Sequence, residues 1–157
     1  LKQGFTYTGI DLSPSAIAYA QNRYKDNPKA AFIVGDVTCL KDIPDSCFDA
    51  GLDILFFHML VTDEHRRKYL SEVRRVLKPA AGMLLMQAVR PAAVIEEVSG
   101  SGDLSGGKED TNHLPRIPAR FNNEAGYRRE MQEAGFVIRK SYTRDRRCFM
   151  HLKNVRE

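Results

Sequence analysis

The feature that most constrains the fold is an alternation of short apolar runs with segments of helical periodicity. Residues 5–10 are rich in β-forming side chains and end at Asp11. Ser13 followed by Pro14 then marks the start of a helix, since Ser caps helices well and Pro fits their first position. Further apolar runs follow at 31–34, 47–55 and 83–89. Strands that alternate with helices predict a mostly parallel, doubly wound α/β sheet covered on both faces.

The second half of the chain changes character. Apolar residues share one helical face over 64–78, which Pro79 ends, and again over 122–134. Gly, Ser, Pro and charged residues predominate between 91 and 120, so we expect a loop-rich insertion there. The final stretch, "AGFVIRKSYTRDRRCFMHLKN", predicts two strands joined by a turn near 143–146, a C-terminal antiparallel hairpin.

Length and composition favour one globular domain over residues 1–157. The chain is 43% hydrophobic, and its longest apolar runs fall well short of the roughly 18 to 20 residues that a membrane span requires. We therefore expect a soluble, cytoplasmic protein. The three cysteines lack a CxxC pair and any metal-like spacing with the four histidines, which predicts reduced, mostly buried thiols and no metal site.

The net charge of +4 is mild, although basic residues gather at 65–68, 74–75 and 139–147. Such clusters can neutralise phosphates, but they more often form ordinary solvated faces. No aromatic-rich surface or known nucleic-acid motif accompanies them. The sequence therefore does not favour a nucleic-acid partner.

Two aspartates, Asp11 and Asp36, each follow one of the first two predicted strands. In doubly wound sheets ligands bind outside the carboxyl ends of the strands, and an acid in the position of Asp11 accepts hydrogen bonds from ribose hydroxyls. Asp36 could accept from the exocyclic amine of a purine while the Val37 N–H meets a ring nitrogen. Either aspartate alone is more often a turn former or a helix cap. The pair, with apolar Leu12 able to lie against a flat base, points to an adenosine.

The stretches "GIDLSPSAIAYA", "FIVGDVTCL", "SCFDAGLDILFFHML", "YLSEVRRVLKPAAGMLLM" and "GYRREMQEAGFVIRKSY" follow one another along the chain. In this order the sequence resembles the class I S-adenosylmethionine-dependent methyltransferases over most of residues 5–143. The resemblance implies a Rossmann-like fold, S-adenosylmethionine as cofactor and methyl transfer as activity. It assigns Asp11 to the ribose, Leu12 and Val37 to the adenine, Asp36 to the adenine amine, and Asp53 to the methionine part of the cofactor.

By the same resemblance Phe57 and His58 would face the substrate. His58 is the candidate general base, because the histidine pKa lies near neutrality and the residue falls just beyond a strand end. The alternative is a histidine that packs at an apolar helix start. The sequence lacks the Asn/Asp-Pro-Pro-aromatic and Pro-Cys motifs of the family's nucleic-acid enzymes, which favours a small-molecule acceptor.

Two other classes of function stay open. A short-chain dehydrogenase would also place acids after successive strands, but Tyr69 and Tyr19 are followed four residues later by Val73 and Arg23 instead of the lysine of the catalytic Tyr-x-x-x-Lys. A non-catalytic binding module could keep the same fold without turnover.

The sequence departs from the family in its first unit. The glycine-rich E/DxGxGxG motif should lie about 20 residues before an acid such as Asp11, where this sequence has none. We expect the first strand, loop and helix to be absent, the chain to be a fragment, and a gap between the strands at 5–10 and 48–55. The glycines in 94–107 are out of register with Asp11 and follow the helix-like "AAVIEEV", so a circular permutation is not favoured. Ala81 replaces a family glycine in a turn that favours positive φ.

Overall fold

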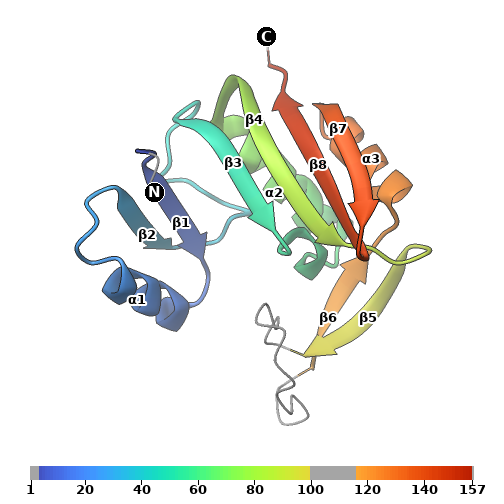
Figure 1. Cartoon of the computed structure of the whole chain (residues 1–157), viewed down its shortest axis with the longest axis horizontal. Helices are drawn as coiled ribbons and strands as arrows, with labels where there is room; N and C mark the ends of the chain where they lie inside the picture. Colours follow the sequence, from blue (N-terminus) through green and yellow to red (C-terminus); the bar gives the residue numbers. More distant parts are fainter. Residues whose placement is uncertain (1–3, 100–115, 157) are drawn as a thin grey trace.

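The computed structural model describes residues 4–99 and 116–156 (Figure 1). Its elements follow in the order β1 (Tyr7–Asp11), α1 (Pro14–Arg23), β2 (Ala30–Val34), β3 (Phe48–Ile54), η1 (Phe57–Met59), α2 (Asp63–Val76), β4 (Leu77–Ala88), β5 (Val94–Ser99), β6 (Arg116–Phe121), α3 (Glu124–Glu133), β7 (Phe136–Arg144) and β8 (Arg147–Asn154). The alternation expected from the sequence is confirmed, and so is the C-terminal hairpin of β7 and β8.

The strands form three separate sheets. β1 and β2 make a parallel pair, four strands form a sheet in the order β3-β4-β8-β7, and β5 pairs with β6 in an antiparallel hairpin. Within the larger sheet β3 and β4 are parallel, whereas β8 runs antiparallel to both β4 and β7. Among the described residues β1 and β3 do not pair, so the sheet is divided where the sequence predicts a gap.

Helices α2 and α3 lie behind the four-stranded sheet in Figure 1, and the main core fills the space between. Inward-facing residues of the sheet alternate with outward-facing ones, as a strand requires. On the opposite face several large apolar side chains are exposed: Leu52, Ile54, Leu84, Val137 and Tyr142. The prediction of helices on both faces is therefore not met by this sheet in the described part of the chain.

The predicted helix start after β1 is confirmed. The Ser13 hydroxyl accepts a hydrogen bond from the Ala16 N–H at 3.2 Å, and Pro14 takes the first helical position. Thr62 and Asn123 cap α2 and α3 in the same way. Each cap gives a partner to an N–H that the helix itself leaves without one.

Strand β4 is longer than the predicted 83–89, because it begins directly after α2, at Leu77. Its register with β3 jumps from Phe48↔Leu77 to Ala50↔Gly82, so Pro79 and its neighbours form a bulge. The left-handed residue of this bulge is Ala80, with φ of 65°, and not Ala81, whose side chain is buried. The predicted strain thus lies one residue earlier.

The segment 91–120 is not a loop throughout. The helix-like interpretation of "AAVIEEV" is wrong, because these residues enter β5 and pair in register with β6, with Val98 opposite Ile117. β-branched Val94, Ile95 and Val98 favour such a pleated surface. The remainder of the predicted insertion, 100–115, lies outside the described residues.

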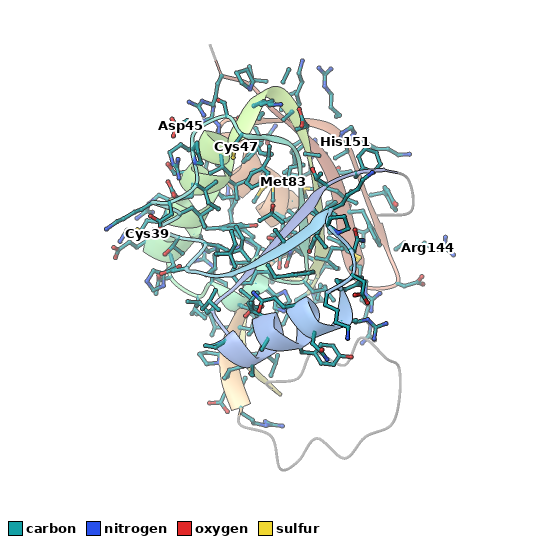
Figure 2. All side chains as sticks on the ribbon, turned by 90° about the vertical axis from the view of Figure 1, so that its left-hand side faces the viewer. Cys39, Asp45, Cys47, Met83, Arg144 and His151 are labelled. Carbon is teal, nitrogen blue, oxygen red and sulfur yellow. The ribbon has the colours of Figure 1, made fainter. Side chains whose placement is uncertain are left out.

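The cysteines are free, as expected, but the prediction that most are buried is wrong. Cys39 and Cys47 are exposed, and only Cys148 is buried. Figure 2 shows Cys39 near the edge of the molecule, while Met83 lies in the interior. Cys39 follows β2, and Cys47 directly precedes β3 at the edge of the predicted apolar run 47–55. No helix in the described ranges is both long and apolar enough to cross a bilayer.

Candidate active site

A cleft of about 220 Å³ lies between the ends of β1 and β3. The cleft is lined by Asp11 at the end of β1 and Leu12 just after it, by Gly35 and Val37 from the segment after β2, and by Asp53 from β3. Parallel strands present their carboxyl ends at one edge of a sheet, which brings these residues together from distant parts of the sequence. All but one of the predicted cofactor-binding residues therefore border one cleft.

The remaining one, Asp36, stands between the lining residues Gly35 and Val37. It follows shortly after Val34, which pairs in register with Asp11, and the Gly35 N–H donates to the Asp11 carbonyl at 2.9 Å. Asp11 and Asp36 thus lie at the same end of neighbouring parallel strands.

Each of these two carboxylates has one oxygen engaged locally. Asp11 Oδ1 accepts from the Ser13 N–H at 2.8 Å, and Asp36 Oδ1 accepts from both the N–H and the hydroxyl of Thr38 at 2.8 Å. The turn interpretation describes this oxygen correctly. Within residues 4–99 and 116–156 the Oδ2 atom of each carboxylate has no hydrogen bond, and both residues are exposed. The bonds from Thr38 lower the pKa of Asp36, which keeps its carboxyl ionised.

Leu12 and Val37 differ in what they present. The Leu12 side chain is 66% exposed and borders the cleft. Val37 is half-buried, and its N–H makes no hydrogen bond with a described residue. An apolar surface and a spare donor are the features that a flat heterocycle needs.

Asp53 is buried, and its carboxylate is fully engaged. Oδ1 accepts from the Phe56 N–H at 3.0 Å, the Phe57 N–H at 3.4 Å and the Gln87 amide at 2.6 Å, and Oδ2 accepts from the Tyr69 hydroxyl at 2.8 Å. Burial raises the pKa of Asp53 although these donors oppose the shift. Any contact of Asp53 with the methionine part of a cofactor therefore falls to its backbone.

His58 lies in η1, outside the lining of the cleft but connected to it. Its Nδ1 is 2.9 Å from Gln87 Oε1, and its ring stacks on Phe121 with centroids 5.0 Å apart. The ring is 9% exposed, so the packing interpretation describes much of its environment. Gln87 and Tyr69 were not predicted as site residues. The available signal for Gln87 was a lone amide inside the apolar strand "MLLMQAV".

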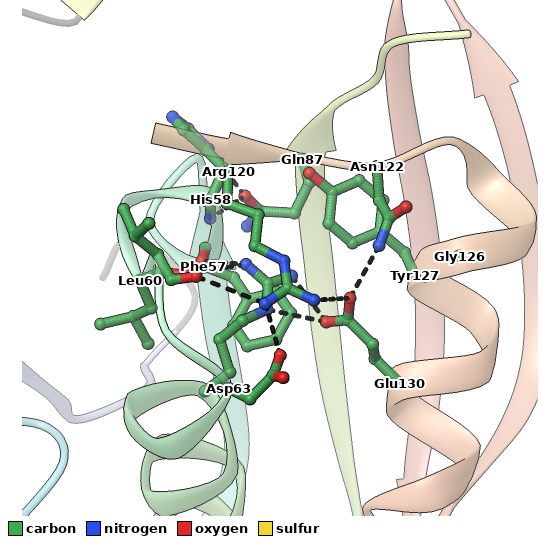
Figure 3. A network of polar contacts seen from close by, with 12 residues as sticks. Phe57, His58, Leu60, Asp63, Gln87, Arg120, Asn122, Gly126, Tyr127 and Glu130 are labelled. Atoms are coloured by element: carbon green, nitrogen blue, oxygen red, sulfur yellow. Dashed lines mark hydrogen bonds and ion pairs between the residues drawn. The ribbon is translucent and has the colours of Figure 1, made fainter. Parts of the chain in front are cut away.

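A second network fixes η1 against α2 and α3 (Figure 3). The buried Arg66 guanidinium donates to Glu130 Oε2 through Nη2 at 2.6 Å and Nε at 2.9 Å, and to the carbonyls of Phe57 and Leu60. Glu130 also accepts from Asn122 at 2.7 Å. This network holds the segment that carries His58.

A larger groove of about 740 Å³ runs between α2 and α3, away from the strand ends, and seven of its lining residues are arginines. Most of these arginines are engaged within the protein. Arg74 donates to the Ala134 and Val155 carbonyls, and Arg75 to Glu72 and Asp45. Of these two hollows in the described part of the chain, the smaller cleft is the one that combines strand-end carboxylates with an apolar surface.

Comparison with known proteins decides the family. A family profile described as "Methyltransferase domain" matches residues 1–85, more than half of the chain. The chain belongs to this methyltransferase-domain family. The resemblance to class I S-adenosylmethionine-dependent methyltransferases is thereby confirmed.

Individual relatives match this chain over different shares of its length. Phthiotriol/phenolphthiotriol dimycocerosates methyltransferase of Mycobacterium leprae is 34% identical over 92 residues, which are 59% of this chain and 32% of that protein. A solved S-adenosylmethionine-dependent methyltransferase from Methanosarcina mazei superposes with a TM-score of 0.77 at 18% identity, covering 99% of this chain and 84% of that one.

The Burkholderia thailandensis 1,6-didemethyltoxoflavin-N1-methyltransferase, solved with 1,6-didemethyltoxoflavin and S-adenosylhomocysteine, has a TM-score of 0.73 at 16% identity. The superposition covers 99% of this chain and 64% of the Burkholderia protein. This chain therefore spans about a third of the length of the curated relative and somewhat less than two thirds of the length of this structural neighbour. At these identities the structural likeness establishes the α/β fold.

Proposed function

We propose that the protein transfers a methyl group from S-adenosylmethionine to a small-molecule acceptor. The observation that carries the proposal is the pair of carboxylates, Asp11 and Asp36, which stand at the ends of neighbouring parallel strands, each with Oδ2 free of other described residues. Two such acceptors suit the ribose hydroxyls and the exocyclic amine of one adenosine.

The residues around the cleft fit the other parts of this cofactor. Leu12 offers an apolar surface to the adenine ring, and the Val37 N–H is a donor for one of its ring nitrogens. The Asp53 backbone borders the same cleft on the β3 side, toward the methionine part. When bound, S-adenosylmethionine supplies a methyl group on a positively charged sulfur, and a protein that orients an acceptor beside it gains most of the rate acceleration.

A small acceptor is supported from two sides. The relatives include a methyltransferase named for phthiotriol dimycocerosates and one solved with 1,6-didemethyltoxoflavin. The arginines of the groove between α2 and α3 mostly bond carbonyls and carboxylates of the protein itself, so this basic groove offers few free charges to a polyanion.

We further propose that an additional strand and helix complete the site. The facing edges of β1 and β3 are not paired with each other, and Leu52, Ile54 and Leu84 expose apolar surface beside the gap. Unpaired strand edges and exposed apolar patches are ordinarily covered. A strand placed between β1 and β3 would join the two sheets into one and bring a third wall to the cleft.

Calorimetric titration of the protein encoded by the complete natural reading frame with S-adenosylmethionine tests the cofactor assignment. Losing a charged hydrogen-bond acceptor costs about 1 to 3 kcal/mol, so Asp11→Ala and Asp36→Ala should each weaken binding by roughly 5-fold to 150-fold. Asp26→Ala, an exposed aspartate after α1, is the matched control and should bind normally. Unchanged affinity in both site variants, or binding of NADH in place of S-adenosylmethionine, would refute the assignment.

A further inference from the structure

Four buried or nearly buried polar side chains form one hydrogen-bonded chain from the cleft to His58. The Tyr69 hydroxyl donates to Asp53, the Gln87 amide donates to the same carboxylate, and the Gln87 carbonyl oxygen faces His58. Gln87 is fully buried and Asp53 is 2% exposed. Side chains this deeply buried adopt the arrangement that satisfies every donor and acceptor.

The orientation of the Gln87 amide is determined by its surroundings. The His58 main-chain N–H can only donate, and it points at Gln87 Oε1 from 3.2 Å. Asp53 Oδ1, which already receives two main-chain N–H groups, lies 2.6 Å from Gln87 Nε2. Reversing the amide would place two donors together at one end and two acceptors together at the other. Gln87 Oε1 must therefore face His58.

This orientation determines the proton on the His58 ring. Gln87 Oε1 has no hydrogen to give, so the ring nitrogen 2.9 Å away, Nδ1, must carry the proton of that hydrogen bond. In the neutral ring Nε2 then holds a lone pair. Among the described residues Nε2 has no hydrogen-bond partner. Because every buried polar side-chain atom of these residues has a partner, Nε2 is not one of the buried atoms.

The surroundings of the ring as a whole favour its neutral form. Burial is the main cause that lowers the pKa of His58, and the positive charges of Arg66 and Arg90 act in the same direction. The bond to Gln87 and the charge of Asp53 oppose the shift. The neutral ring with an open Nε2 is consequently the form present at neutral pH.

We propose that Gln87, itself oriented by Asp53, is a positioning residue that holds His58 as the Nδ1–H tautomer and leaves Nε2 to take a proton from the methyl acceptor. This inference rests on the proposed function and adds the nature of the acceptor: its reacting atom carries a hydrogen, as in a hydroxyl or an N–H group. The bond from that atom to hydrogen breaks, its electron pair stays on the atom, and the proton joins Nε2. The imidazolium then releases the proton to water.

Long-range ¹H–¹⁵N spectra of the histidine-labelled protein test the tautomer directly, without turnover. We expect the wild type to show a protonated Nδ1 and a bare Nε2 at His58 near neutral pH, with the exposed His65 and His151 as internal references. Gln87→Met removes the acceptor oxygen and should abolish the preference. Gln87→Glu, protonated beside Asp53, keeps a donor toward Asp53 and an acceptor toward His58, and should restore it.

Gln132→Met, at an exposed glutamine in α3, is the control for the substitution itself and should leave the spectrum of His58 unchanged. An Nε2–H ring in the wild type, or a retained Nδ1–H ring in Gln87→Met, would overturn the inference. The proposed function fails separately: an Nδ1–H ring in a protein that does not bind S-adenosylmethionine would leave the tautomer assignment standing and remove its role in methyl transfer.

Discussion

Replacing Arg66 by Met should destabilise the protein severely, because this arginine lies on the buried face of α2. The Arg66 side chain is only 4% exposed and its partner Glu130 only 15%. Four hydrogen bonds are lost, two to the carboxylate and two to the carbonyls of Phe57 and Leu60. Removing one partner of a buried ion pair typically costs about 3 to 5 kcal/mol, because the other charge stays buried without compensation.

The same helix provides the matched control. Lys68 bonds Glu64 at 2.7 Å, but these side chains are 55% and 66% exposed. Exposed pairs one helical turn apart contribute about 0.3 to 0.5 kcal/mol, so Lys68→Met should change the free energy of unfolding by about that amount.

Urea denaturation of the two variants and the wild type measures both effects. The double variant Arg66→Met with Glu130→Leu should recover part of the loss, since no charge is then left unpaired. If Arg66→Met and Lys68→Met lower the free energy of unfolding equally, the buried network does not hold η1 in place as described.

Three further predictions follow from the contacts and pKa shifts. Because burial places the pKa of His58 below its usual 6.5, the unfolded chain binds this proton more tightly; stability should therefore fall as pH drops below about 6.5, and His58→Gln should flatten that part of a pH series of urea melts. Native protein should react quickly with a thiol reagent at the exposed Cys39 and Cys47 and slowly at Cys148, since burial raises the pKa of Cys148 to about 11; three equally fast thiols would contradict the structure. Gly135 has φ of 87°, and an added Cβ would lie 2.4 Å from the Arg74 guanidinium, so Gly135→Ala should cost at least about 1 kcal/mol in a thermal melt.

The sequence predicted most of the elements because local rules determine them. Ser13 with Pro14 marks a helix start whatever surrounds it, and the turn between β7 and β8 separates two strand-forming segments that are adjacent in the sequence. The extension of β4 to Leu77 was missed because Pro79 normally ends a strand, and only the bulge opposite β3 accommodates it. Strands β5 and β6 were missed because each depends on the other for pairing, and they lie far apart in the sequence.

The candidate site divides in the same way. Asp11 and Asp36 were predictable, because their position after a strand places them at a known edge of the sheet. That Gln87 of β4 and Tyr69 of α2 donate to the Asp53 side chain could not be predicted from the sequence. Such partners are specified by tertiary packing, and a single polar residue in an apolar strand was their only trace.

Asp53 borders the proposed cofactor cleft and also accepts a hydrogen bond from Gln87, and these two contacts have an evolutionary consequence. A substitution there would disturb both neighbours at once, so selection on either one also restrains this position. Among homologous chains, we expect residues 53, 69 and 87 to be retained or exchanged together, whereas residues 11 and 36, whose side chains share no hydrogen bond, should each be constrained on its own by the ligand of the cleft.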